Sequence, residues 1–199
     1  MKKLLIVVLG CVFLQVISTG NVFSSEGGQY KIDVTHSSIG FAVTHMEVGI
    51  TRGVFTDYSG EVIFDKNNLD AFQAGIVINA SSIDTRLEAR DNHLRNEDFF
   101  HVEKYPTIIF KAKKLLNKAG GYEIVGDFTL RGVTREISVP VSIRGPLRSP
   151  FGGTVIGISG EVTINRQDYG VAWNDTMPGG GFVVGNEVKL VIDIEADHK

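Results

Sequence analysis

The sequence predicts an all-β fold: an eight-stranded antiparallel barrel with a short helical lid segment. About eight segments alternate apolar and polar residues with period two, which is typical of strands that bury one face. Short turn sequences such as Ala119-Gly120-Gly121 and Arg131-Gly132 separate neighbouring segments and favour hairpin connections. One short helix cannot cover the apolar face of so large a sheet, so the sheet is expected to close on itself.

The first 24 residues are expected to be a signal peptide. Lys2 and Lys3 precede an apolar run that extends to Ile17, and small residues follow, with cleavage expected near Ser24. The run is shorter than the roughly 20 residues that cross a bilayer, so a membrane anchor is the weaker interpretation. Lipid attachment at Cys11 is also weaker, because apolar residues continue beyond it. The prediction is a periplasmic protein whose single domain covers residues 25–199.

Composition limits the chemistry of that domain. Cys11 is the only cysteine of the chain, so the mature domain would have no disulfide, thiolate metal site or cysteine nucleophile. The formal net charge of the whole chain is −3, and removal of Lys2 and Lys3 makes the mature domain more acidic. Nucleic acid is therefore not an expected partner.

The strands are expected in chain order, with short loops between them. Pro140 cannot donate to a strand ladder, so a bulge or a gap in the barrel seam is expected there. Gly126, Gly160 and Ala74 occupy inward positions where larger residues would fill space, which leaves open a greasy tunnel or simple relief of strain. The expected strands are residues 37–45, 53–65, 71–80, 107–116, 122–130, 133–143, 156–164 and 188–194.

The helical lid is the most polar part of the chain. Thr85-x-x-Glu88 predicts a capping box for a helix that ends near Leu94. A structural interpretation has Arg90 binding a carboxylate such as Asp84 or Asp98, while Asp91 accepts backbone donors. A functional interpretation has Arg90 or His93 contacting the head group of a ligand.

Catalytic motifs are missing from the sequence. It contains no HExxH, GxSxG, GxxxxGK or GxGxxG pattern. Convergence of three of the histidines on zinc has no support in their spacing. We therefore expect no metal and no cofactor, and a binding protein rather than an enzyme. An enzyme that acts on a lipid through His45 or the Asp91/His93 region is the first alternative, and a side-chain-filled interaction module is the second.

An ordered set of residues from Tyr30 to Gly170 resembles the YceI-like family of polyisoprenoid-binding proteins. The resemblance extends from about Tyr30 to Ala196, and residues 172–182 depart from the usual pattern. The matching residues are Tyr30, Asp33, His36, Ser37, Phe41 and His45; Gly53 and Phe55; Ser82, Asp84 and Thr85; Arg90, Asp91, His93 and Leu94; Asp98, Phe99 and Phe100; Tyr105, Pro106 and Phe110; Gly126, Thr129, Leu130, Gly132, Val133 and Thr134; and Arg166 and Gly170.

The resemblance implies a lipocalin-like barrel that holds a long isoprenoid or a similar fatty amphiphile, such as a polyprenyl phosphate or an isoprenoid quinone. It also allows contact with a membrane surface or a membrane cytochrome, and a homodimer. The bound lipid would be a ligand rather than a cofactor. Carried over by position, the ligand-binding residues are Phe41, His45, Phe55, Arg90, Asp91, His93, Phe99, Phe110 and Phe128.

Overall fold

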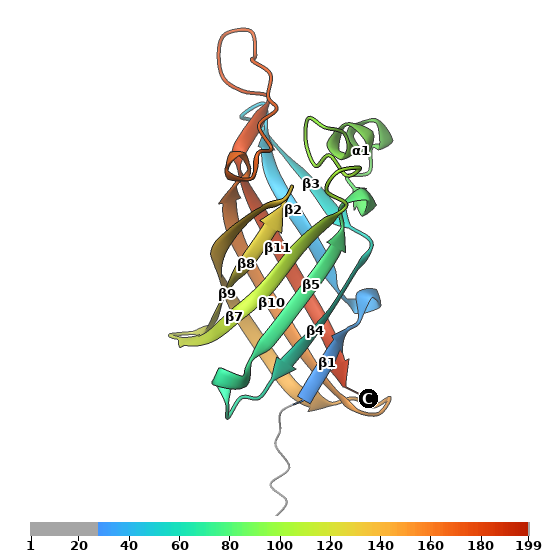
Figure 1. Ribbon diagram of the computed structural model, residues 1–199, viewed down its shortest axis with the longest axis vertical. Coiled ribbons are helices and arrows are strands. Elements are labelled where there is room, and N and C mark those ends of the chain that lie inside the picture. The colour runs from blue at the N-terminus through green and yellow to red at the C-terminus, as the bar shows by residue number, and fades with distance from the viewer. Residues whose placement is uncertain (1–27, 199) are drawn as a thin grey trace, which may run out of the picture.

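The computed structural model describes residues 28–198, so the expected signal peptide, with Cys11, lies outside the described residues. This part of the chain forms one α-helix and eleven β-strands, joined by loops and four short 3₁₀ helices (Figure 1). The strands and the helix are β1 (Gly28–Ile32), β2 (Ser38–His45), β3 (Gly49–Phe55), β4 (Tyr58–Phe64), β5 (Gln73–Asn79), β6 (Ile83–Asp84), α1 (Glu88–Arg95), β7 (Thr107–Lys118), β8 (Gly121–Leu130), β9 (Val133–Arg148), β10 (Thr154–Asn165) and β11 (Val184–His198).

The strands form a closed eight-stranded antiparallel barrel, which confirms the predicted fold class. The ladder β1-β4-β5-β7-β8-β9-β10-β11 returns to its start because β11 also pairs with β1. Three of the barrel strands are built from two pieces each. The strands β2, β3 and β6 continue β1, β4 and β5 upward, with β2 paired to β11 and to β3, and β3 paired to β6.

The strand predictions omit β1 and β6, and they also differ from the structure at these interruptions. The expected strand 53–65 is two strands, because Ser82 takes the hydrogen bonds at the junction: its carbonyl accepts from the Thr56 amide at 3.1 Å, and its hydroxyl accepts from the Asp57 amide at 3.1 Å. Before Ser38, the chain turns through the 3₁₀ helix η1 (Val34–His36), whose first amides are capped by the Asp33 carboxylate. Both breaks allow the long first strands to bend around the barrel.

The prediction at Pro140 is confirmed as a gap in the seam. Pro140 stays paired with Glu123 of β8, without a shift of register. The pairing of β9 with β10, however, ends at Val141 opposite Gly160, while β10 continues along β11 as far as Asn165. The 3₁₀ helix η4 (Arg166–Tyr169) follows β10, and Arg135 of β9 donates to the carbonyl of Asp168 at 3.0 Å.

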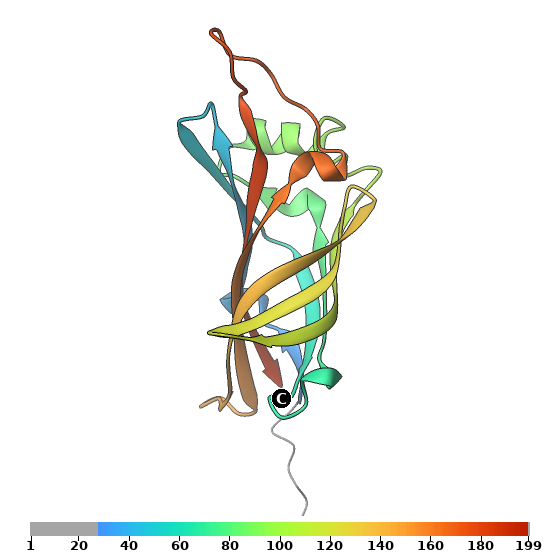
Figure 2. The same cartoon turned by 90° about the vertical axis from the view of Figure 1, so that its left-hand side faces the viewer.

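The barrel interior is divided into a filled half and a hollow half. At the end that holds β1 and the C-terminal residues, Tyr30, Phe64, Phe72, Ile156 and Ala196 are all at most 5% exposed, and none of them lines the cavity described below. The helix α1 and the loop before β11 lie at the opposite end (Figures 1 and 2). Within residues 28–198, no helix has the length and hydropathy that a membrane-spanning helix needs. The hollow half is the half next to α1, because residues of α1 line its cavity.

Candidate functional site

The hollow half of the barrel encloses a cavity of about 330 Å³. Its wall combines inward-facing side chains of β2 to β5 and β7 to β11 with residues of α1. The wall is almost entirely aliphatic and aromatic, as expected for the inner face of strands with period-two alternation. This volume lies within the range of small-molecule sites in proteins. A side-chain-filled barrel, the basis of the second alternative, is not what the structure contains.

Eight of the nine residues predicted to bind the ligand line this cavity. The strands hold the aromatic ones in register: Phe110 of β7 is paired with Phe128 of β8, and the rings of Phe41 and Phe55 lie 6.3 Å apart. The eight residues are Phe41, His45, Phe55, Arg90, His93, Phe99, Phe110 and Phe128. The ninth, Asp91, is buried but does not line the cavity.

The small residues contribute differently from one another. Ala74 lines the cavity, as expected for a position that leaves space. Gly126 and Gly160 do not, so the tunnel interpretation is wrong for both. A β-carbon at Gly126 would lie 2.6 Å from the Lys111 carbonyl oxygen and 2.7 Å from the Phe110 ring, and one at Gly160 would lie 2.6 Å from the Pro140 carbonyl oxygen. Both glycines are needed for close packing.

The lid is held by a network centred on Thr85. The Asp91 carboxylate accepts from the Thr85 amide at 2.9 Å and from the Thr85 hydroxyl, so the prediction that Asp91 binds backbone donors is confirmed. Thr85 does not form the predicted capping box. The residue that precedes α1 is Leu87, which makes no side-chain cap; the helix ends at Arg95, close to the predicted end near Leu94. The capping prediction fails because the Thr85 hydroxyl is committed to Asp91.

Arg90 also binds Thr85 rather than a carboxylate. Its Nε donates to the Thr85 hydroxyl oxygen and its Nη2 to the Thr85 carbonyl oxygen, each at 2.7 Å. The expected clamp on Asp84 or Asp98 is therefore wrong. Asp84 instead accepts from the Arg86 amide at 2.7 Å, where a positive φ of 65° turns the chain into the lid. The guanidinium of Arg90 is thus fixed at the edge of the cavity.

His93 joins the lid to the loop before β11. Its Nε2 lies 2.9 Å from the Asp98 carboxylate, and its ring meets the rings of Phe99 and Trp173 edge-on, at centroid distances of 5.0 Å and 4.9 Å. Arg131, in the β8–β9 turn, donates to the carbonyls of Glu97 and Phe99 and so fixes the other side of the lid. These contacts form an aromatic rim at the α1 end of the cavity.

Arg166 also lines the cavity, although the sequence did not predict it as a ligand-binding residue. It is only 4% exposed, and it links residues 171–173 to the first residues of β11 through hydrogen bonds to backbone carbonyls. Burial lowers the pKa of its guanidinium. In the sequence, Arg166 stands out only as part of the ordered pattern with Gly170. Its position could not be found from spacing, because its partners come from a loop of irregular structure.

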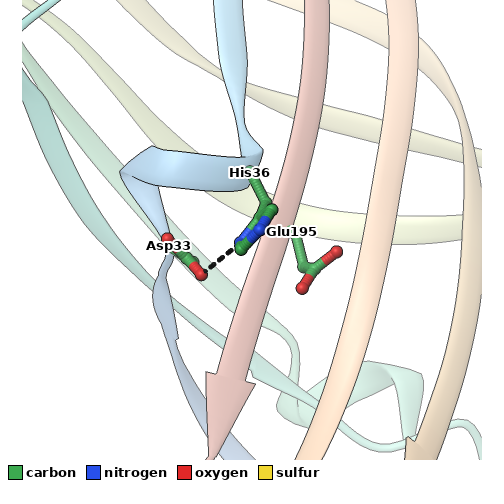
Figure 3. Close-up of side chains that lie close together, drawn as sticks. All are labelled: Asp33, His36 and Glu195. Carbon is green, nitrogen blue, oxygen red and sulfur yellow. Dashed lines mark hydrogen bonds and ion pairs between the residues drawn. The ribbon is translucent and has the colours of Figure 1, made fainter. Parts of the chain in front are cut away.

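A second polar cluster, outside the cavity, contains Asp33, His36 and Glu195 (Figure 3). His36 Nδ1 lies 2.8 Å from Asp33 Oδ2. This hydrogen bond is the main reason that the pKa of His36 is raised and that of Asp33 is lowered. Among the described residues, this is the group whose ligand atoms come close enough to suit a metal, within 4.8 Å of one another. It contains a single histidine, and none of its members lines the cavity.

Several known proteins resemble this chain over most of its length. A UPF0312 protein of Staphylococcus aureus (strain N315) is 34% identical over 167 residues, which are 83% of this chain and 95% of that protein. A YCEI protein of Campylobacter jejuni is 29% identical, with a TM-score of 0.68 over 78% of this chain and 90% of that one.

Two more distant solved structures share the fold. BcnA of Burkholderia cenocepacia has a TM-score of 0.72 at 23% identity, over 82% of this chain and 98% of that one. A polyisoprenoid binding domain from Saccharophagus degradans, described as implicated in plant cell wall breakdown, has a TM-score of 0.62 at 18% identity, over 85% and 98%. The sequence profile of the YceI-like domain matches residues 30–196. The chain therefore belongs to the YceI-like domain family.

Proposed function

We propose that this protein binds and carries a long-chain amphiphile, an isoprenoid or a similar lipid, with the apolar tail enclosed in the barrel. The observation that carries the proposal is the apolar cavity of about 330 Å³ beside α1. Each methylene group withdrawn from water contributes roughly 0.8 kcal/mol. A tail can thus supply most of the binding energy without polar contacts, which matches a wall built almost wholly of hydrocarbon.

Two further points support an isoprenoid ligand and export. The distant structural relative from Saccharophagus degradans is described as a polyisoprenoid binding domain. The expected signal peptide at residues 1–24 would deliver the mature chain to the periplasm, where a water-soluble carrier is needed to move such a lipid between membranes. Transport, storage and sensing all require the same cavity.

The first test is to identify what the protein carries. The mature chain is purified from its native periplasm without detergent and extracted with organic solvent, and the extract is analysed by mass spectrometry. We expect a stoichiometric long-chain isoprenoid or a related amphiphile. An empty extract, followed by no uptake when the protein is mixed with such lipids, would overturn the proposal.

The cavity itself is tested with a charged substitution. Phe110→Arg places a cation in the apolar wall, and we expect lipid retention to be lost in a protein that still folds. Phe151→Arg is the matched control, because Phe151 is 97% exposed and does not line the cavity. Trp173, the only tryptophan of the chain, lines the cavity and reports occupancy by its fluorescence.

The same experiments address the enzyme alternative. Asp91 is engaged by Thr85 and His93 lies against Asp98, so these two side chains are not paired with each other as an acid and a base. The proposal predicts that prenyl phosphates and isoprenoid quinones are recovered chemically unchanged after incubation with the protein. Turnover that disappears in His45→Ala would instead establish an enzyme.

A further inference from the structure

The polar groups in the cavity wall have a one-sided charge. Four of the side chains that line it are arginines or histidines, namely His45, Arg90, His93 and Arg166. Throughout residues 28–198, no aspartate or glutamate lines this cavity. The asymmetry does not follow from composition, because the chain as a whole carries a formal net charge of −3. The cavity therefore concentrates positive charge within an acidic protein.

Arg166 shows this asymmetry most clearly, because it is a buried cation that has no anionic partner among the described residues. All of its hydrogen bonds go to neutral oxygens: its Nε binds the Gly185 carbonyl at 2.9 Å, and its Nη1 binds the carbonyls of Val171 and Trp173 at 2.8 and 2.7 Å. Its Nη2 makes only long contacts of 3.4 Å, to Val184 and Asn186. In the part of the chain that the structure describes, no carboxylate forms an ion pair with it.

A role as a loop clamp explains those hydrogen bonds but not the charge. A neutral donor would hold the same carbonyls without the cost of burying a cation. Buried charges in proteins are ordinarily paired, and an unpaired one raises the free energy of the empty protein. An anion that enters the cavity would remove this penalty, and its attraction to the guanidinium is stronger in an apolar interior than in water.

The four basic side chains converge at one end of the cavity. His45 is the strand partner of Val184, whose carbonyl accepts from Arg166. Arg166 also binds the carbonyl of Trp173, whose ring packs on His93. His93 and Arg90 lie three residues apart on α1 and so share one helix face. These contacts define a continuous basic rim at the lid.

Arg90 is the member of this rim that can contact a ligand directly. Its Nε and Nη2 bind Thr85, but no hydrogen bond to a residue between 28 and 198 uses its Nη1. Those N–H groups remain as donors on a residue that lines the cavity, in the planar geometry that suits phosphate and carboxylate oxygens. Thr85 holds the rest of the guanidinium in place, so the free donors are already oriented.

We propose that the amphiphile in the cavity carries an anionic head group, a phosphate or a carboxylate, which binds Arg90 at the lid within the field of buried Arg166 while the tail occupies the apolar wall. This inference rests on the proposed function. It narrows the ligand class from amphiphiles in general to anionic ones, and it disfavours neutral quinones and alcohols of the same tail.

The test compares ligands that share a tail and differ in head group. Delipidated protein is titrated with farnesyl monophosphate and with farnesol, and in a second pair with palmitate and hexadecanol, while Trp173 fluorescence is followed. We expect at least one anion to bind about tenfold or more tightly than its own alcohol. The pair that shows the larger preference distinguishes phosphate from carboxylate as the source of the charge. The preference should decrease as salt concentration rises.

Variants assign the preference to the proposed residues. Arg90→Gln should reduce the preference for the anion over its own alcohol several-fold; because this preference is a ratio measured on one protein, a change that weakens both ligands equally does not affect it. Arg52→Gln is the matched control, because Arg52 is exposed and does not line the cavity. Arg166→Gln should have the same effect as Arg90→Gln if it folds, and Arg90→Gln keeps the test valid if it does not. Equal affinities for alcohol and anion would overturn the inference and leave the carrier function standing, whereas binding of neither would overturn both.

Discussion

Replacement of Asp91 by alanine tests whether the lid is held by the Thr85 network. In the structure, one oxygen of the Asp91 carboxylate accepts both the amide and the hydroxyl of Thr85, and the carboxylate and Thr85 are each only 4% exposed. The substitution leaves two buried donors without their acceptor. It also releases the hydroxyl whose oxygen accepts from Arg90 Nε.

The expected loss is worked from these two hydrogen bonds. Each hydrogen bond to a charged group contributes about 1.5–3 kcal/mol, and relief from burying the carboxylate offsets part of the sum. We expect Asp91→Ala to lower the free energy of unfolding by about 3 kcal/mol, measured by urea denaturation monitored by circular dichroism. In a domain of this size, the melting temperature should fall by roughly 2–4 °C per kcal/mol.

A control variant in the lid and a double variant test whether the loss of stability comes from the Thr85 network. Glu97→Ala removes an exposed acid from the same lid and should change stability by less than about 0.5 kcal/mol. Thr85→Val combined with Asp91→Ala should cost less than the sum of the two single changes, because both remove the same interaction. A loss below about 1 kcal/mol in Asp91→Ala, or strict additivity, would show that the lid is held by other contacts.

Gly126 and the Asp33–His36 pair allow tests in other parts of the barrel. Gly126→Ala should destabilise the fold by about 1–3 kcal/mol, because the new methyl group would overlap the Lys111 carbonyl oxygen, whereas Gly75→Ala, which has open space, should be nearly neutral in the same denaturation assay. The bond between Asp33 and His36 raises the pKa of His36 above 6.5 and lowers that of Asp33 below 3.8, so its full contribution to stability is present between these two pH values. That contribution is lost as pH rises through the folded-state pKa of His36 or falls through that of Asp33. An NMR titration should show the pKa of His36 returning toward 6.5 in Asp33→Asn, and an unchanged value would contradict the assignment.

The sequence predicted the barrel because each strand buries one face, and that pattern is local. The resemblance to the YceI-like family predicted the aromatic wall, and Phe41, Phe55, Phe110 and Phe128 all line the cavity. The breaks in the first strands could not be predicted in this way. One of them depends on Ser82, which reaches the chain at Thr56 from 26 residues away.

The site was predictable only where a side chain's role depends on its own strand. The sequence leaves the role of Gly126 open between tunnel space and relief of strain, because the choice depends on a carbonyl and a ring of the neighbouring strand β7. Thr85 was misassigned because a capping residue and the acceptor of a lid network have the same local sequence. The role of Arg166 could not be predicted, because its carbonyl partners lie partly in a loop that only the folded structure places beside β11.

The filled half of the barrel has a consequence for the length of tail that the protein can accept. Under the proposed function, a tail that entered beside α1 would end against the buried layer of Tyr30, Phe64 and their neighbours. That layer would limit the length of tail the barrel can hold, and it is also part of the packed core. Capacity and stability are therefore coupled: shortening a side chain such as Phe64 would admit a longer tail, at a cost of roughly 3–5 kcal/mol in folding free energy. In a barrel of this design, a change that admits a longer tail also lowers the free energy of unfolding.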